Sequence, residues 1–297
     1  MPGRSDVLVP FVVEGAAVRG ALVRLPTVAR DIVAAHPYPP PLARALSELA
    51  AAAALLASTL KQDGSLLLQI AGDGPVRLAV VECTGDLALR GTAQWDAARV
   101  AALPVDATLA DLAGGAGARM TITLDPRDGG ALYQGIVALS ATTIGALIEH
   151  YLATSEQLDS RLLLATDGIA AAGLLLQRLP GATAADDATW TRLATALGAV
   201  EPAALCAQAS DSGLLASLFP ADDLRVFDKR AVEARCSCSR ERVETALAIA
   251  GRDEIEAALD ERGHVEVTCE FCNRRYVFTP VEARAVFAPR PPVTRLH

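Results

Sequence analysis

Length, composition and charge set the first limits on this chain. It has 297 residues and a net charge of −8, and 52% of its residues are hydrophobic although only 4% are aromatic. Such a chain can bury a sizeable core built mainly from Ala, Val and Leu, and its acidic balance disfavours binding to the phosphate backbone of nucleic acids. Neither of its two lysines, Lys61 and Lys229, follows a glycine, so the phosphate-binding Gly-Lys-Ser/Thr motif of ATPases is absent.

Strand and helix patterns alternate over residues 18–178. Two strand-like runs, 65–70 and 76–81, flank the turn cluster Gly72-Asp73-Gly74-Pro75, which predicts a hairpin. Residues 42–60 are rich in Ala and Leu and predict a helix that is buried on most sides. Further strands are expected at 18–24, 87–94, 120–124, 133–139, 161–166 and 171–176, with another helix at 142–154. Strands in hairpins with helices grouped between them indicate an α+β fold and not a parallel doubly wound sheet.

The pattern changes at Leu179-Pro180-Gly181 and is helical and Ala-rich up to about residue 225. Short helices are marginal by themselves, yet this stretch carries many apolar residues, among them Trp190, Leu193, Leu197, Leu205, Leu214, Leu215, Leu218 and Phe219. We therefore expect residues 182–235 to form a helical linker that packs on the N-terminal sheet. The predicted organisation is an N-terminal core domain of mixed sheet and helix (1–181), this linker, and a small C-terminal domain (236–297).

The C-terminal domain has its own start and stop signals. Ser239 is a typical cap for a helix that ends at Gly251. Asp253 with Glu256 resembles the capping box of a second short helix, which ends at Gly263. Alternating apolar and polar residues then predict a strand over 265–268, and another strand is expected over 276–278.

No segment of the sequence is a convincing membrane span or leader. The longest solidly apolar run, residues 49–60, has 12 residues, whereas a spanning helix needs about 20. The N-terminus has one basic residue, Arg4, before an apolar run that Pro10 interrupts, which is a weak secretory signal at best. We expect a cytoplasmic protein, in which thiols stay reduced.

Six cysteines are therefore informative, because clustered thiols in a reducing compartment indicate metal or redox chemistry. Cys236 and Cys238 form one pair, Cys269 and Cys272 a second, and 30 residues separate the pairs. Four thiolates that reach one point match a closed tetrahedral Zn²⁺ site. The second pair lies between two predicted strands and is followed by Asn273, which tolerates the left-handed backbone of a zinc knuckle. The first pair is so closely spaced that we expect its backbone to leave the extended conformation.

Spacing alone leaves several interpretations of the four cysteines open. They could form a purely structural zinc site, a catalytic dithiol, a nucleic-acid-binding zinc ribbon or a set of buried apolar thiols. Residues 228–297 contain twelve Lys and Arg and twelve Asp and Glu, so the basic surface of a phosphate binder is missing. His264 is the one histidine near the cysteines, and we interpret it as a turn residue. Cys83 and Cys206 lie elsewhere in the sequence and are expected to be packing residues.

Sequence motifs around the cysteines resemble a known family. Cys236-Ser237-Cys238-Ser239-Arg240-Glu241-Arg242, Cys269-Glu270-Phe271-Cys272-Asn273, Tyr276 and Phe278 are similar to the redox-switch domain of the bacterial heat-shock protein thirty-three family. Motifs resembling its core domain occur in family order, namely Pro39-Pro40-Pro41, Asp73-Gly74-Pro75-Val76-Arg77, Tyr133-Gln134-Gly135-Ile136-Val137, Ser155-Glu156-Gln157-Leu158 and Leu174-Leu175-Leu176-Gln177-Arg178-Leu179-Pro180-Gly181. The resemblance covers nearly the whole chain.

This resemblance implies a redox-regulated, ATP-independent holdase chaperone and not an enzyme. The reduced form of such proteins holds one Zn²⁺ per chain through the four cysteines and is an inactive monomer. Peroxide with heat, or hypochlorous acid, converts the thiolates to two disulfides and releases the zinc. The linker then unfolds, homodimers form, and the core domain binds unfolding clients. We expect the disulfides to join Cys236 with Cys238 and Cys269 with Cys272, because these partners are adjacent in the chain.

Two departures from the family pattern stand out. Ala234 replaces an aromatic residue that commonly stands two positions before the first cysteine, and Cys83 and Cys206 are not switch cysteines of the family. A constitutive zinc domain that serves as an adaptor or binds nucleic acid is the second hypothesis. Zinc release on addition of peroxide distinguishes it from the redox-activated holdase.

Overall fold

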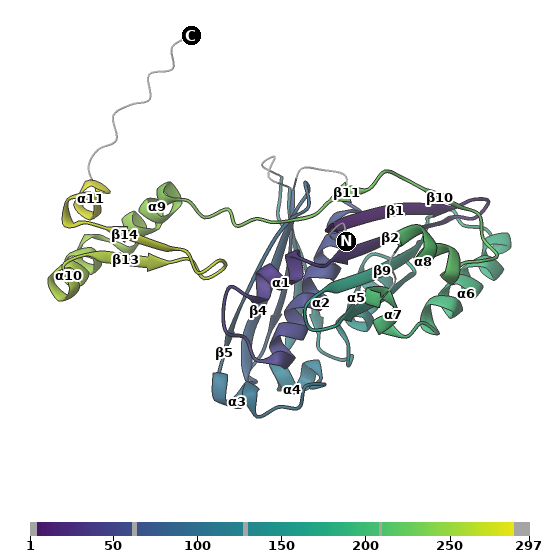
Figure 1. Ribbon diagram of the computed structural model, residues 1–297, viewed down its shortest axis with the longest axis horizontal. Coiled ribbons are helices and arrows are strands. Elements are labelled where there is room, and N and C mark those ends of the chain that lie inside the picture. Colours follow the sequence, from purple (N-terminus) through teal and green to yellow (C-terminus); the bar gives the residue numbers. More distant parts are fainter. Residues whose placement is uncertain (1–4, 61–63, 127–129, 208–209, 288–297) are drawn as a thin grey trace, which may run out of the picture. The chain divides into compact units, whose positions relative to one another are not determined.

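The computed structural model describes residues 5–60, 64–126, 130–207 and 210–287 (Figure 1). The chain forms two compact units, Met1–Arg235 and Cys236–His297. Among the described helices, none combines the length and the hydrophobicity that a membrane span requires.

Two six-stranded sheets, counted over the described residues, form the framework of the first unit. The first sheet has the order β10-β1-β2-β9-β8, and β11 also pairs with β1; the second has the order β12-β5-β4-β3-β6-β7. The pairing of β12 with β5 is parallel, whereas the other described pairs are antiparallel. Most of the strands are β1 (Val7–Val13), β2 (Val18–Leu25), β3 (Ser65–Ala71), β4 (Val76–Thr84), β5 (Ala88–Trp95), β6 (Arg119–Asp125), β7 (Tyr133–Ala138), β8 (Ser160–Thr166) and β9 (Ala171–Arg178). The predicted α+β class is confirmed.

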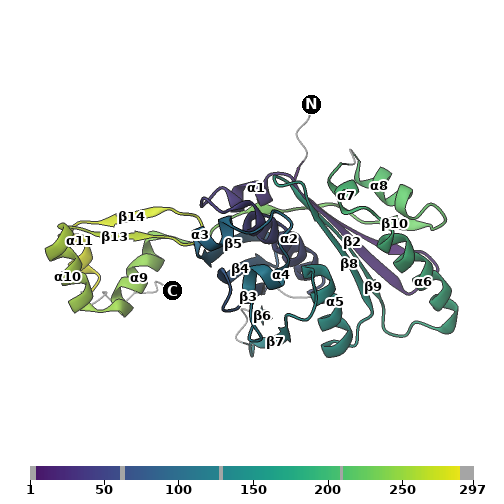
Figure 2. The same cartoon turned by 90° about the horizontal axis from the view of Figure 1, so that it is seen from below.

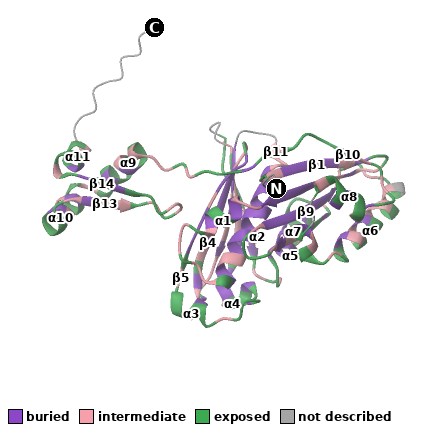
Figure 3. Cartoon of the chain, viewed as in Figure 1, coloured by how far each residue is buried: buried purple, intermediate pink, exposed green. Residues whose placement is uncertain are grey.

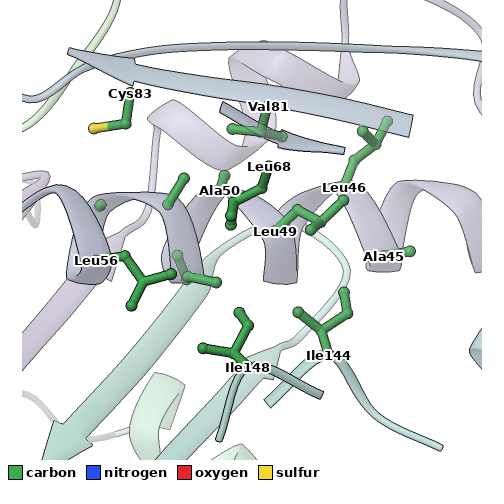
Figure 4. Packing of buried hydrophobic residues seen from close by; sticks show 14 of the residues in the cluster. Ala45, Leu46, Leu49, Ala50, Leu56, Leu68, Val81, Cys83, Ile144 and Ile148 are labelled. Atoms are coloured by element: carbon green, nitrogen blue, oxygen red, sulfur yellow. The ribbon is translucent and has the colours of Figure 1, made fainter. Parts of the chain in front are cut away.

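Helix α2 (Pro40–Ala57) lies between the two sheets (Figure 2). Residues 45–57 of this helix are all buried or nearly so except Glu48, because strands of both sheets pack on it. Figure 4 shows its leucines between side chains of the second sheet and of α5, with Leu46, Leu49, Leu56, Leu68, Val81, Ile144 and Ile148 labelled. The helix begins slightly before the predicted start, since Pro40 and Pro41 occupy its first turn, where the missing N–H is not needed. The other helices of this region are α1 (Val28–Val33), α3 (Ala97–Ala101), α4 (Leu109–Ala113) and α5 (Ile144–Ser155).

Three linker helices cover the outer face of the first sheet, namely α6 (Ala184–Gly198), α7 (Pro202–Ala207) and α8 (Asp211–Leu218). Side chains alternate along a strand, so β2 directs Leu22 toward the linker helices and Val23 toward α2. Figure 3 shows the strands of this sheet buried and much of the helical surface exposed. The linker cluster consists of Leu193, Leu197, Leu205, Leu214, Leu215 and Phe219 with Val9, Phe11, Val13, Val18, Leu22, Ala165, Ala172, Leu174 and Leu176. The expectation that the linker packs on the N-terminal sheet is confirmed.

The helical pattern expected up to about residue 225 ends earlier, at Leu218, and the last part of the expected helical linker (182–235) is extended. After α8 the chain is extended and forms β10 (Leu224–Val226), β11 (Arg230–Ala231) and β12 (Glu233–Ala234). These two- and three-residue strands are stabilised by pairing with β1 and β5, which are distant in sequence. A periodicity argument needs a longer run, so it could not detect them.

The second unit packs helices against a small hairpin. Its elements are α9 (Arg240–Ala250), α10 (Arg252–Arg262), β13 (Val265–Thr268), β14 (Arg275–Phe278) and α11 (Pro280–Ala285). The Ser239 hydroxyl accepts a hydrogen bond from the backbone of Arg242, as expected of a cap, and Gly263 ends α10 in the left-handed conformation with φ of 72°. The capping box predicted at Asp253 is wrong, because α10 begins directly after Gly251 and places Asp253 inside its first turn.

Candidate metal centre

The four clustered cysteines bring their sulfur atoms together in the second unit. The Sγ atoms of Cys236 and Cys269 are 3.7 Å apart, and those of Cys238 and Cys272 are 3.4 Å apart. All four Sγ atoms lie within 4.8 Å of one another. A tetrahedral zinc–thiolate site with bonds of about 2.3 Å requires sulfurs about 3.8 Å apart. The sulfur positions therefore fit a metal ion such as zinc.

The first pair of ligands stands just before helix α9. Residues 236–239 belong to no helix or strand, and Ser239 is extended, with φ of −144° and ψ of 165°. The expectation that the backbone bends between Cys236 and Cys238 stays a prediction. Ser239 then caps α9, which fixes the point at which the chain turns into the helix. The guanidinium of Arg242, on the first turn of α9, donates to the Ser237 hydroxyl at 2.7 Å and so ties the residue between the two cysteines to the helix.

The second pair of ligands is held at the tip of the β13–β14 hairpin. The backbone N–H of Cys269 donates to the carbonyl of Arg274 at 2.9 Å, and that of Asn273 donates to the carbonyl of Cys269 at 2.8 Å. Asn273 has φ of 56°, the left-handed conformation expected for a zinc knuckle. These bonds close a tight turn that presents both sulfurs on one side.

Tyr276, which the sequence analysis named only as part of the family motif, contacts one of the four cysteines. Its hydroxyl donates a hydrogen bond to the Cys238 sulfur at 3.1 Å. Burial disfavours ionisation of Cys238, but hydrogen bonds from Tyr276 and the neighbouring thiols outweigh it and lower the pKa of Cys238 to about 7. Burial instead raises the pKa of Cys236, and it raises that of Cys272 to about 12. The sequence signals for this residue were its place in the family motif and on the strand that leaves the knuckle, but neither predicted its contact with Cys238.

The remaining cysteines and His264 do not belong to this cluster. Cys83 on β4 is fully buried in the main core, and burial raises its pKa to about 12, so its thiol is unreactive. Cys206 on α7 packs against the linker cluster. The expectation that both are packing residues is confirmed. His264 Nδ1 lies 3.0 Å from the carbonyl oxygen of Arg262, which agrees with the interpretation as a turn residue.

The first unit is a two-sheet α+β fold covered by a helical linker, and the second unit brings four thiols together in a geometry that suits a metal ion. The chain is thus a two-unit α+β protein with a candidate cysteine metal centre in its small C-terminal unit. The Hsp33 protein family model matches residues 6–279. This chain therefore belongs to the Hsp33 family of chaperones, and the resemblance inferred from the sequence motifs is confirmed.

Relatives named 33 kDa chaperonin match over nearly their whole length. One from Chromobacterium violaceum is 43% identical over 286 residues, which covers 95% of this chain and 94% of that protein. One from Methylobacillus flagellatus is 39% identical with the same coverage. The crystal structure of the 33 kDa chaperonin from Thermotoga maritima matches with a TM-score of 0.81 at 22% identity, covering 95% of this chain and 98% of that chain, and it supports the fold.

Proposed function

We propose that this protein is a redox-regulated, ATP-independent holdase of the cytoplasm. While Cys236, Cys238, Cys269 and Cys272 are reduced and hold one Zn²⁺, it is an inactive monomer. Oxidation of the four thiolates releases the metal and activates the protein to bind unfolding clients under oxidative stress. The observation that carries this proposal is the convergence of the four sulfurs in a small unit that directly follows the docked linker. The protein has no catalytic role toward its clients.

Metal binding matters for stability because the second unit has a small core. Its buried apolar residues are Val243, Leu247, Ile255, Leu259, Val265, Tyr276, Phe278 and Ala283. Units of this size rarely reach adequate stability from their core alone. A bound zinc ion contributes about 10 kcal/mol to the folding of such a domain and holds its ligands as thiolates. Loss of the metal therefore unfolds the chain from about Cys236 onward.

Oxidation proceeds through thiolate attack on the oxidant. A cysteine thiolate attacks hydrogen peroxide, becomes a sulfenic acid and releases hydroxide, which takes up a proton to give water. A neighbouring thiol then attacks the sulfenic sulfur, which forms the disulfide and releases a second water. Each disulfide thus consumes one peroxide, and two are needed per chain. We propose pairing of Cys236 with Cys238 and of Cys269 with Cys272.

Disulfide mapping tests this pairing. In the folded unit all four Sγ atoms lie within 4.8 Å of one another, so every pairing is within reach once the metal leaves. A dominant bridge between the two ligand segments, such as Cys238–Cys269, in peptide mapping by mass spectrometry would contradict the proposed pairing.

Unfolding of the second unit reaches the linker through the adjacent backbone. Arg235, whose N–H donates to the carbonyl of Leu89 at 2.9 Å, directly precedes Cys236. Helices α7 and α8 have six and eight residues, which is too short for independent stability. We propose that residues 182–235 act as a releasable linker on a core domain of residues 1–181. Undocking exposes the apolar face of the first sheet to clients and to a second copy of the chain, which gives an oxidised homodimer.

Zinc release and chaperone activity can be followed in one experiment. Peroxide is added to the reduced protein while a chromogenic chelator reports free zinc and light scattering reports aggregation of a heat-denatured client. We expect zinc release to precede suppression of aggregation. Cys272→Ser should bind far less zinc, whereas Cys83→Ser and Cys206→Ser should each retain one equivalent. Zinc that stays bound in peroxide, together with unchanged activity, would favour the constitutive zinc domain.

A further inference from the structure

The extended end of the linker pairs with an edge of each sheet in the first unit. We call residues 223–235 the edge segment. Its strand β10 runs antiparallel along β1, with Arg225 opposite Val12, and β11 continues on the same strand. Strand β12 then runs parallel along β5, with Ala234 opposite Leu89. One short stretch of chain therefore closes both sheet edges just before the first cysteine.

Backbone hydrogen bonds account for much of this attachment. Beyond the ladder of β10 itself, five of them join the edge segment to the two sheets: Glu14 N–H to Asp223 (2.8 Å), Phe227 N–H to Pro10 (2.9 Å), Val232 N–H to Asp6 (3.1 Å), Glu233 N–H to Leu87 (3.1 Å) and Arg235 N–H to Leu89 (2.9 Å). Pro10 offers only its carbonyl, which is tolerated because β1 is an edge strand of the core domain. Backbone bonds of this kind form with any extended chain, whatever its side chains.

Two apolar side chains anchor the edge segment. Val232 is only 4% exposed and belongs to the main core, and Leu224 packs against the linker cluster. By contrast, Val226 and Phe227 are exposed large hydrophobic residues. Arg225 and Lys229 form ion pairs with Glu14 and Asp211 at 3.1 and 2.6 Å. The segment thus behaves as a bound peptide with two apolar anchors eight residues apart.

We propose that the edges of β1 and β5, once the edge segment has left them, bind extended segments of unfolding clients by strand addition. This inference rests on the proposed function, because oxidation must first release the linker. An exposed sheet edge is a template for pairing with another chain, and here the protein's own linker occupies that template in the reduced state.

The occupant follows from what the edges accept. The edge of β1 pairs with an antiparallel segment and the edge of β5 with a parallel one. A client segment can therefore run in either direction relative to the strand it joins, depending on which edge it occupies. The anchors require aliphatic side chains at two positions, whereas the intervening residues are charged or exposed. Extended, aliphatic-containing segments of many sequences meet these requirements, and such segments are abundant in unfolding proteins.

A synthetic peptide of residues 221–235 tests this mode of binding. The control peptide has the same side chains but is N-methylated at Phe227, Glu233 and Arg235, which removes backbone donors that pair with the sheets. We expect the peroxide-oxidised full-length protein to bind the unmodified peptide. Its anti-aggregation activity should fall at least tenfold when the peptide saturates the protein. The N-methylated peptide should bind at least tenfold more weakly, and the reduced protein should bind neither peptide.

Amide hydrogen exchange supplies an independent readout. In the oxidised protein, addition of a denatured client should slow exchange of the Val12 and Glu14 amides at least tenfold. Two results would overturn strand addition while leaving the holdase proposal intact. The first is equal competition by both peptides. The second is an oxidised protein that suppresses aggregation but shows neither competition by the peptide nor added protection by the client. Dissociation of a dimer by the peptide without loss of client binding would show that a second copy occupies the edges, which also overturns it. An oxidised protein that suppresses no aggregation would instead refute the proposed function.

Discussion

Replacing Leu215 with Asp should release the linker helices while the metal centre stays intact. Leu215 lies on α8, is only 1% exposed and belongs to the cluster that joins α6–α8 to the first sheet. Its side chain faces the sheet, in the first unit, whereas the four cysteines belong to the second unit. The substitution therefore perturbs docking without removing a metal ligand.

The expected magnitude follows from burial. A fully buried leucine contributes about 1.5–3 kcal/mol through the apolar surface it removes from water. A carboxyl group in the same place lacks a partner, and even in its neutral form it adds roughly 1–3 kcal/mol of desolvation cost. The docking free energy should therefore fall by about 2.5–6 kcal/mol. Because about 1.4 kcal/mol changes an equilibrium tenfold, the undocked population should rise by roughly two to four orders of magnitude.

Chaperone activity of the reduced, zinc-loaded variant is the assay. Light scattering of a heat-denatured client should show suppression of aggregation without any oxidant, and zinc content should remain one equivalent. Amide hydrogen exchange should accelerate over 184–218. The matched control is Ala216→Asp, which places the same carboxylate on the exposed face of the same helix. The control should remain inactive until it is oxidised.

Three outcomes would refute the reasoning. If Leu215→Asp stays inactive when reduced although its linker exchanges faster, undocking of the linker is not sufficient for activity. If its exchange over 184–218 equals that of the wild type, the packing of Leu215 does not control docking. Equal activation by Ala216→Asp would show that added charge, and not loss of packing, causes the effect.

Two further predictions concern single hydrogen bonds. Tyr276→Phe removes the hydroxyl that donates to Cys238, so zinc affinity measured by chelator competition should fall about 10- to 100-fold. The control Tyr133→Phe, in the first unit, should leave zinc affinity unchanged. Unchanged affinity in Tyr276→Phe would argue against a role of its hydroxyl in metal binding. Hydrogen bonds from the backbone of Thr183, then from the backbone of Ala17 at 2.9 Å, lower the pKa of the Asp186 carboxyl from its ordinary value of 3.8. Its contribution to docking of α6 is therefore present above pH 3.8 and is lost as the pH falls through the lowered pKa. Acid titration of tryptophan fluorescence should show this step in the wild type and not in Asp186→Asn, and the same step in both proteins would count against it.

Local signals in the sequence were sufficient for many elements. The turn Gly72-Asp73-Gly74-Pro75 predicts the β3–β4 hairpin, and the structure contains it. Ser239 and Gly263 mark helix ends because a cap acts on neighbouring backbone groups. The capping box at Asp253 failed because Gly251 allows α10 to begin almost without a break after α9.

Sequence alone determined the features that depend on nearby residues or on motif order. Cysteine spacing and residue type predict the four-sulfur cluster, and the motifs identify the family, which the comparisons confirm. Only the tertiary structure decided which distant groups meet. The Tyr276 hydroxyl reaches Cys238 across 38 positions, and the edge segment pairs with β1 and β5 although more than 140 residues separate Arg235 from Leu89. Such contacts are set by how sheets and helices stack, because a two-residue strand has no periodicity of its own and is stabilised only by the edge on which it lies.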